Sequence, residues 1–124
     1  MNILIIEDEF LIADMMEITF ADCGHNVKTI SGVKNTDPEH FVGLNGIAEE
    51  PIDLSTIDAV FTDGNLDRNG LNGWDVVAAI KGVVKMIVAM SSNPENNDLM
   101  VSLGATHHMS KMDVCRLGPS LVAA

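Results

Sequence analysis

The most constraining feature of this sequence is a series of short apolar runs, each of which ends in polar residues. The first run, residues 2–6 (NILII), has no polar interruption after Asn2, as is typical of a strand buried on both faces. Similar runs occupy residues 58–62 and 85–90, and two more polar segments, residues 26–30 and 106–109, are also expected to form strands. Because patterns with helical spacing separate most of these runs, the order predicts parallel strands joined by right-handed crossovers. We therefore expect one doubly wound α/β domain over residues 1–124, with a five-stranded parallel sheet.

The predicted helices have clear end signals. Gly24 closes the first helix, Pro94 begins the helix over 94–103, and Gly104 follows that helix. Another helix is expected over 73–81, and a short one in the last dozen residues. The first helix carries an apolar stripe, on which Cys23 is expected to be buried. The members of this stripe are Ile12, Met15, Met16, Thr19, Phe20 and Cys23.

Residues 31–57 are the least regular part of the pattern. Asp37 followed by Pro38 is typical of a helix start, with the aspartate as cap. Gly43 and Gly46 weaken such a helix, each by about 1 kcal/mol relative to alanine. We predict a short or irregular second helix here, followed by an acidic loop over 49–51. Its apolar side would be formed by Phe41, Leu44, Ile47 and Ala48.

Composition restricts the classes of partner. Seven Lys and Arg residues stand against eighteen Asp and Glu, and the net charge of −11 argues against a nucleic-acid surface. The same charge suits a Mg²⁺ site or a partner with a basic face. Two cysteines do not form a disulfide framework. The chain shows neither a basic leader segment nor an apolar run of membrane-spanning length, so we expect a cytoplasmic protein without membrane insertion.

The polar residues that end the strands form a chemically consistent set. Glu7 and Asp8 follow the first strand and Asp63 follows the third, whereas Ser91 and Lys111 follow the fourth and fifth. The carboxyl ends of parallel strands meet at one edge of a sheet, where ligands bind in folds of this class. Each residue alone is commonplace as a cap or surface group, but four strand ends that all supply such groups are hard to ascribe to chance.

These residue types suit phosphoryl transfer. Three neighbouring carboxylates repel one another unless a cation offsets their charge, and oxygen ligands favour Mg²⁺. Asp63 is then a nucleophile that forms an acyl phosphate. Lys111 supplies a positive charge for a phosphate oxygen, and the Ser91 hydroxyl donates a hydrogen bond to another.

The sequence resembles the response-regulator receiver family, the CheY-like variant of the flavodoxin-like fold, over almost its whole length. The resemblance rests on ILIIEDE, DAVFTDGNL, MIVAMSSN and GATHHMSK, which occur in the family's order. It implies that Asp63 is phosphorylated and that Lys111 binds the phosphoryl group, with Ser91 as the switch hydroxyl. It also implies a Mg²⁺ site organised by Glu7, Asp8, Asp63 and the backbone carbonyl of Asn65, with Glu7 acting through water.

The sequence departs from the family pattern in three places. The loop after Asp63 lacks the usual proline and is about two residues longer. Met112 replaces the proline that usually follows the lysine, and we predict a trans bond because a cis bond to another residue type costs about 3 kcal/mol. His108 occupies a position that is often aromatic, where a histidine would make switching sensitive to pH. An exposed polar replacement is the simpler interpretation.

The resemblance implies a two-component response regulator. Its phosphodonor would be a sensor histidine kinase or a histidine phosphotransfer protein, and at most it would catalyse its own phosphorylation and dephosphorylation. Phosphorylation would repack the face made by the helix over 94–103, the strand over 106–109 and the last helix. No output domain is expected after residue 124, so the signal would pass to a separate partner or to a second copy in a homodimer, unless the chain is a fragment. The alternative is a pseudo-receiver, an interaction module that works without phosphorylation.

Overall fold

The computed structural model describes residues 1–66 and 71–123. Five parallel strands form the central sheet in the order β2-β1-β6-β7-β8. These strands are Asn2–Ile6 (β1), Asn26–Ile30 (β2), Ala59–Thr62 (β6), Met86–Met90 (β7) and His107–Met109 (β8). The order reverses between β1 and β6, which is the arrangement of a doubly wound α/β sheet. The predicted fold class and the five predicted strands are confirmed.

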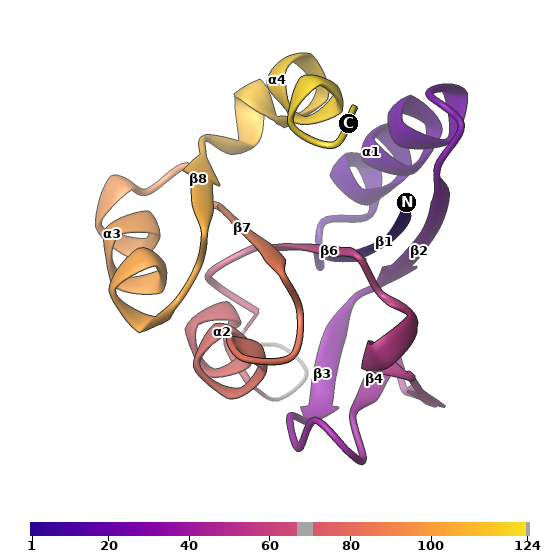
Figure 1. Ribbon diagram of the computed structural model, residues 1–124, viewed down its shortest axis with the longest axis vertical. Helices are drawn as coiled ribbons and strands as arrows, with labels where there is room; N and C mark the ends of the chain where they lie inside the picture. Colours follow the sequence, from indigo (N-terminus) through magenta and orange to yellow (C-terminus); the bar gives the residue numbers. More distant parts are fainter. Residues whose placement is uncertain (67–70, 124) are drawn as a thin grey trace.

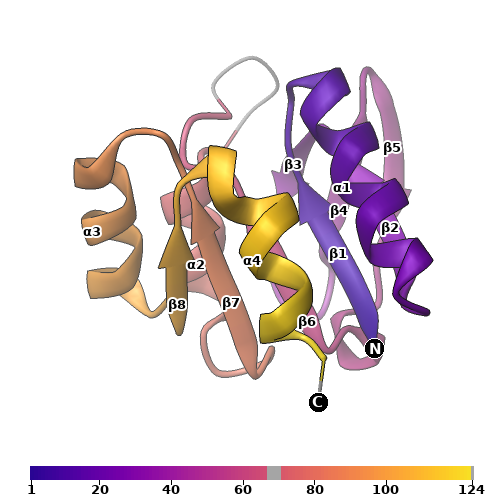
Figure 2. The same cartoon turned by 90° about the horizontal axis from the view of Figure 1, so that it is seen from above.

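Helices cover both faces of the sheet (Figures 1 and 2). Helices α1 (Phe10–Asp22) and α4 (Val114–Leu121) lie on one face, where Phe20 packs against Phe61 with ring centroids 4.9 Å apart. Helices α2 (Gly73–Ile80) and α3 (Pro94–Leu103) lie on the other face, over a second apolar core. Burial of both faces of β1, β6 and β7 explains why these strands read as continuous apolar runs.

Local signals explain where these helices begin and end. Asn72 and Asp75 form a capping box at the start of α2, and the Asn93 side chain accepts a hydrogen bond from the Glu95 backbone N–H at the start of α3. Gly24 and Gly104 follow α1 and α3 with φ of 89° and 128°, a conformation that favours glycine. Among residues 1–66 and 71–123, no helix is both long and apolar enough to cross a membrane.

The segment between β2 and β6 differs from the prediction. In place of a short or irregular helix it forms a three-stranded antiparallel sheet of β3 (Gly32–Asn35), β4 (Val42–Asn45) and β5 (Ala48–Pro51), followed by a 3₁₀ turn, Leu54–Thr56. This sheet lies beside α2 in Figure 1. The second helix along the described chain is instead α2, which is short, with 8 residues.

Glycine geometry explains this correction. Gly46 has φ of 63° and is the first residue of the two-residue turn in which Asn45 pairs with Ala48, a common way to close a β-hairpin. A Cβ on Gly43 would lie 2.9 Å from Ile30 Cδ1, so the Ile30 side chain, which projects from the main sheet, would have to shift to make room for it. Asp37 does cap, but it caps a turn: its Oδ1 accepts a hydrogen bond from the Glu39 backbone N–H at 3.1 Å.

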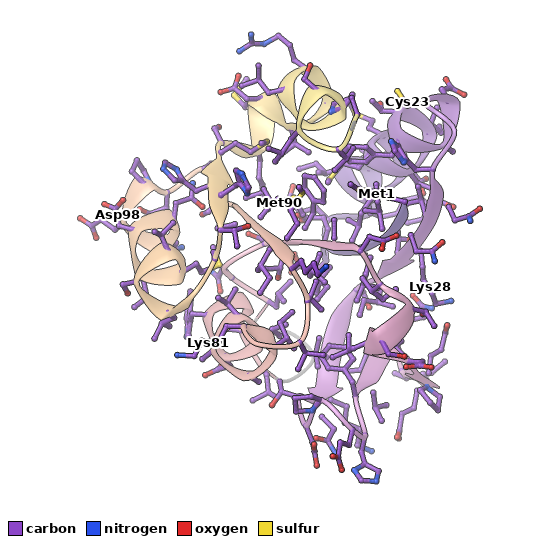
Figure 3. The ribbon with its side chains drawn as sticks, in the orientation of Figure 1. Met1, Cys23, Lys28, Lys81, Met90 and Asp98 are labelled. Carbon is purple, nitrogen blue, oxygen red and sulfur yellow. The ribbon has the colours of Figure 1, made fainter. Side chains whose placement is uncertain are left out.

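Two expectations for the first helix also need correction. Cys23 is exposed rather than buried, because the chain leaves the helix there (Figure 3). Met15 is 58% exposed, whereas Met16 and Phe20 are fully buried. The buried face of α1 is therefore narrower than the sequence stripe, which leaves large apolar side chains on the surface.

Candidate functional site

The carboxyl ends of the strands bring the predicted site residues together. Asp8, Asp63, Asn65, Ser91 and Lys111 all line one cavity of about 670 Å³. Glu7 lies beneath it, 2% exposed, and its backbone N–H donates a hydrogen bond to the Ile30 carbonyl at the end of β2. The cavity lies beside the point where the strand order reverses, where ligands bind in open α/β sheets.

Asp63 is held at the end of β6 by its backbone and by its side chain. Its backbone N–H donates to the Ile6 carbonyl at 2.9 Å, and its Oδ1 accepts a weaker hydrogen bond from the Asn65 backbone N–H at 3.4 Å. The residue is 3% exposed. Burial raises the pKa of Asp63, and the Lys111 ammonium partly opposes that rise. The result is a buried carboxylate at the wall of a polar cavity.

Lys111 Nζ lies among three carboxylates. It donates to Asp63 Oδ2 at 2.8 Å, to Glu9 Oε1 at 3.0 Å and to Glu7 Oε1 at 3.1 Å. Burial lowers the pKa of this ammonium, but the hydrogen bonds to Asp63 and Glu9 and the nearby charges outweigh burial and raise it. The peptide bond before Met112 is trans, as predicted, and the lysine still reaches the site.

The acidic cluster has the ligand chemistry of a hard cation. Carboxylate oxygens of Glu7, Asp8 and Asp63 lie within 4.8 Å of one another. Glu7 Oε2 is buried and receives no hydrogen bond within the described residues. Burial and the neighbouring Asp63 charge raise the pKa of Glu7 to about 7. An orphaned buried oxygen beside two further carboxylates fits a Mg²⁺ site.

Ser91 belongs to a hydrogen-bonded unit with the start of α3. Its Oγ accepts from the Asn93 backbone N–H at 3.1 Å, and its own backbone N–H donates to the Met109 carbonyl at 3.3 Å. Because the oxygen accepts from Asn93, the hydroxyl hydrogen remains available to a ligand in the cavity.

The comparisons with known proteins agree with this architecture. No family model matches the chain, and no curated protein matches its sequence. Among solved structures, the receiver domain of NtrX from Brucella abortus matches with a TM-score of 0.67 and 21% identity, over 98% of this chain and 97% of that chain. The chain has the fold of response-regulator receiver domains.

Other solved receiver structures show the same fold. The chemotaxis protein CheY4 from Vibrio cholerae has a TM-score of 0.61 and 21% identity, over 89% of this chain and 85% of that chain. The BeF3-activated receiver domain of RstA from Klebsiella pneumoniae has a TM-score of 0.64 and 18% identity, over 90% and 86%. Against a longer NtrX chain the present chain spans only 26% of the length.

Two residues near the candidate site were not singled out from the sequence. Glu9 binds Lys111, and the side chain of Asn97 bonds to the carbonyls of Ser91 and Met109. The acidic run 7–9 was a signal for Glu9, whereas nothing in the sequence distinguishes Asn97 from its neighbour Asn96. His108, like His107, is exposed. The prediction of a lengthened loop after Asp63 falls partly on residues 67–70, which lie outside the described residues.

Proposed function

We propose that this chain is a two-component response regulator whose receiver domain accepts a phosphoryl group on Asp63. The observation that carries the proposal is the position of Asp63: a buried carboxylate on the wall of a cavity that also presents Lys111 and Ser91. A carboxylate, an ammonium and a hydroxyl at one sheet edge are the groups that an acyl-phosphate site needs.

In the proposed reaction a carboxylate oxygen of Asp63 attacks the phosphorus of a phosphohistidine. The new P–O bond forms an acyl phosphate as the P–N bond breaks, and the leaving imidazole keeps the bonding electron pair and takes up a proton. Lys111 Nζ exchanges its bond to Asp63 for one to a phosphoryl oxygen, and the Ser91 hydroxyl donates to another. Water then attacks the phosphorus, the bond between Asp63 and the phosphoryl group breaks, and the free carboxylate and inorganic phosphate are released.

The metal proposed for this site is Mg²⁺, held by Glu7, Asp8, Asp63 and the backbone carbonyl of Asn65. When bound, it would offset the negative charge of the carboxylates and of the phosphoryl oxygens. The orphaned Oε2 of Glu7 supports this assignment. The role of the Asn65 carbonyl stays a prediction.

The surface beside the cavity supports a protein phosphodonor, a histidine kinase or a histidine phosphotransfer protein. Phe10 lines the cavity and is 74% exposed, and Leu11, Met15 and Ile18 continue one exposed apolar stripe along α1 at helical spacing. Contiguous exposed apolar side chains of this kind mark protein interaction sites. A cytoplasmic location and an output partner on the α3, β8 and α4 face remain part of the proposal.

A phosphodonor assay tests the proposal against the alternative, a pseudo-receiver that works without phosphorylation. The protein is incubated with acetyl phosphate and Mg²⁺, and its intact mass is measured. The proposal predicts one phosphoryl adduct in the wild type and none in Asp63→Asn. An unmodified wild-type protein, together with no change in Trp74 fluorescence on adding beryllofluoride, would favour the pseudo-receiver.

A further inference from the structure

One side chain of α3 joins the two backbone segments that carry the phosphate-binding groups. Asn97 Nδ2 donates to the Ser91 carbonyl at 3.1 Å and to the Met109 carbonyl at 3.1 Å. Ser91 follows β7, and Met109 ends β8 two residues before Lys111. The amide thus bridges the ends of two neighbouring strands at the cavity.

The orientation of this amide is fixed by its partners. Both groups that it contacts are carbonyl oxygens, which only accept hydrogen bonds, so the NH₂ group must face them. The opposite atom, Oδ1, is buried and receives no hydrogen bond from the described residues. Asn97 is 5% exposed. A buried polar side chain with an unsatisfied acceptor is costly, and an apolar residue would serve the core better.

The bridge also ties Ser91 to the helix that follows it. Ser91 Oγ accepts from the Asn93 backbone N–H, and Asn93 Oδ1 accepts from Glu95 to begin α3. The side chain of Asn97, in the first turns of the same helix, donates a hydrogen bond to the Ser91 carbonyl. Because these bonds close a ring through Ser91 and α3, Ser91 cannot move without moving α3 or breaking the Asn97 bonds.

From this geometry we infer that Asn97 is a positioning residue: it sets the placement of the Ser91 hydroxyl relative to Lys111 and transmits displacement of Ser91 to α3. The consequence for phosphorylation rests on the proposed function. The structural part, that Asn97 holds the ends of β7 and β8 together, does not depend on it.

Amide hydrogen exchange tests the structural part directly. In Asn97→Ala the loss of two hydrogen bonds is expected to speed exchange of the Ser91 amide about tenfold. Amides in the middle of β7, such as that of Val88, should keep their rates. Asn97→Ser, which retains one donor, should give an intermediate exchange rate for the Ser91 amide. It replaces the alanine variant in this test if that variant does not fold. Leu103→Ala, which loosens α3 without touching either carbonyl, is the matched control. Unchanged Ser91 exchange, or an equal rise at Val88, overturns the inference.

The rate of adduct formation with acetyl phosphate tests the functional part. Asn97→Ala should slow phosphorylation of Asp63 about tenfold, and the factor should shrink in a Ser91→Ala background because the two residues act through one group. The effects of Leu103→Ala and Ser91→Ala on the phosphorylation rate should be independent, so their factors should multiply in the double variant. If Asn97→Ala slows phosphorylation by the same factor in the wild-type and the Ser91→Ala backgrounds, the positioning role is contradicted. If the wild type forms no adduct although Ser91 exchange rises in Asn97→Ala, the proposed function fails and the structural role of Asn97 stands.

Discussion

Lys111 Nζ lies 2.8 Å from Asp63 Oδ2, a pair that joins the segment after β8 to the end of β6. The two side chains are 11% and 4% exposed. Through Glu7 and Glu9 the same ammonium offsets two more carboxylates. In this state the lysine offsets part of the negative charge of the site, and in the proposed reaction its ammonium would bind an oxygen of the incoming phosphoryl group.

Removing this ammonium should destabilise the protein. Lys111→Ala leaves Asp63 and Glu7 as neighbouring buried carboxylates, and loss of one partner of a buried pair costs about 3 kcal/mol in the free energy of unfolding. The loss should be smaller at pH 5 than at pH 8, because a carboxyl that takes up a proton no longer needs the pair. Urea unfolding without Mg²⁺ measures it, with Lys85→Ala at an exposed lysine as control. Equal stability of the two variants at pH 8 would contradict the pairing.

Glu7 should make the metal-free protein less stable as the pH rises. Its pKa is about 7 in the fold against an ordinary 4.5, so between these values the folded chain holds a proton that the unfolded chain has released. Stability from this group is present below pH 4.5 and falls by about 3 kcal/mol as the pH rises to 7.

Glu7→Gln, which cannot ionise, should flatten this slope in urea unfolding measured in EDTA from pH 4.5 to 8. Glu39→Gln, at an exposed glutamate, is the control and should keep the wild-type slope. A Glu7→Gln protein with an unaltered pH profile would show that Glu7 is ionised in the fold throughout this range.

Gly73 should tolerate no side chain. A Cβ at this position would lie 1.8 Å from the Asp63 carbonyl oxygen, because the start of α2 packs directly on the backbone that carries the site. We expect Gly73→Ala to lose about 3 kcal/mol or more of unfolding free energy. In Gly82→Ala the added methyl meets none of the described residues within 4 Å, so stability should stay the same or rise slightly. Thermal unfolding of the two variants decides the matter, and similar melting temperatures would rule out the close approach.

The exposed stripe on α1 should matter only for a protein donor. Leu11→Asp places a charge on an apolar surface beside the cavity and should slow phosphotransfer from a phosphorylated histidine protein at least tenfold, while leaving the rate with acetyl phosphate unchanged. The control is Ile47→Asp, at a side chain that is 99% exposed on the β4–β5 turn. The docking role would fail if Leu11→Asp affected both donors equally.

The sheet, and the meeting of polar residues at one edge of it, could be predicted from the sequence because both depend on strong local patterns. Buried strands read as apolar runs, and their polar last residues had to meet at one edge once the strands were parallel. Lys111 reached the site although Met112 replaces proline, since its position follows from the end of β8. The segment over 31–57 was predicted wrongly because Asp37-Pro38 serves a turn as well as a helix. The stronger signal was Gly46, because a two-residue hairpin turn often has glycine at its first position.

Features that depend on contacts between residues far apart in the sequence could not be predicted from it. Asn97 became notable only when its amide was found between two strand ends, and Gly43 only when the Ile30 side chain was found against it. Cys23 was expected to be buried because it continues an apolar helical stripe, yet the helix ends one residue earlier. Helical periodicity identifies a buried face but not how far along the helix the core extends.

The central claim is that Asp63 carries the phosphoryl group, and borohydride trapping tests it most directly. After incubation with acetyl phosphate and Mg²⁺, borohydride reduces an aspartyl phosphate to homoserine, and tandem mass spectrometry of the digested protein locates the altered residue. The account predicts homoserine at position 63 in donor-treated wild type alone. Homoserine at Asp8 instead, or none in a sample whose intact mass shows a phosphoryl adduct, would contradict it.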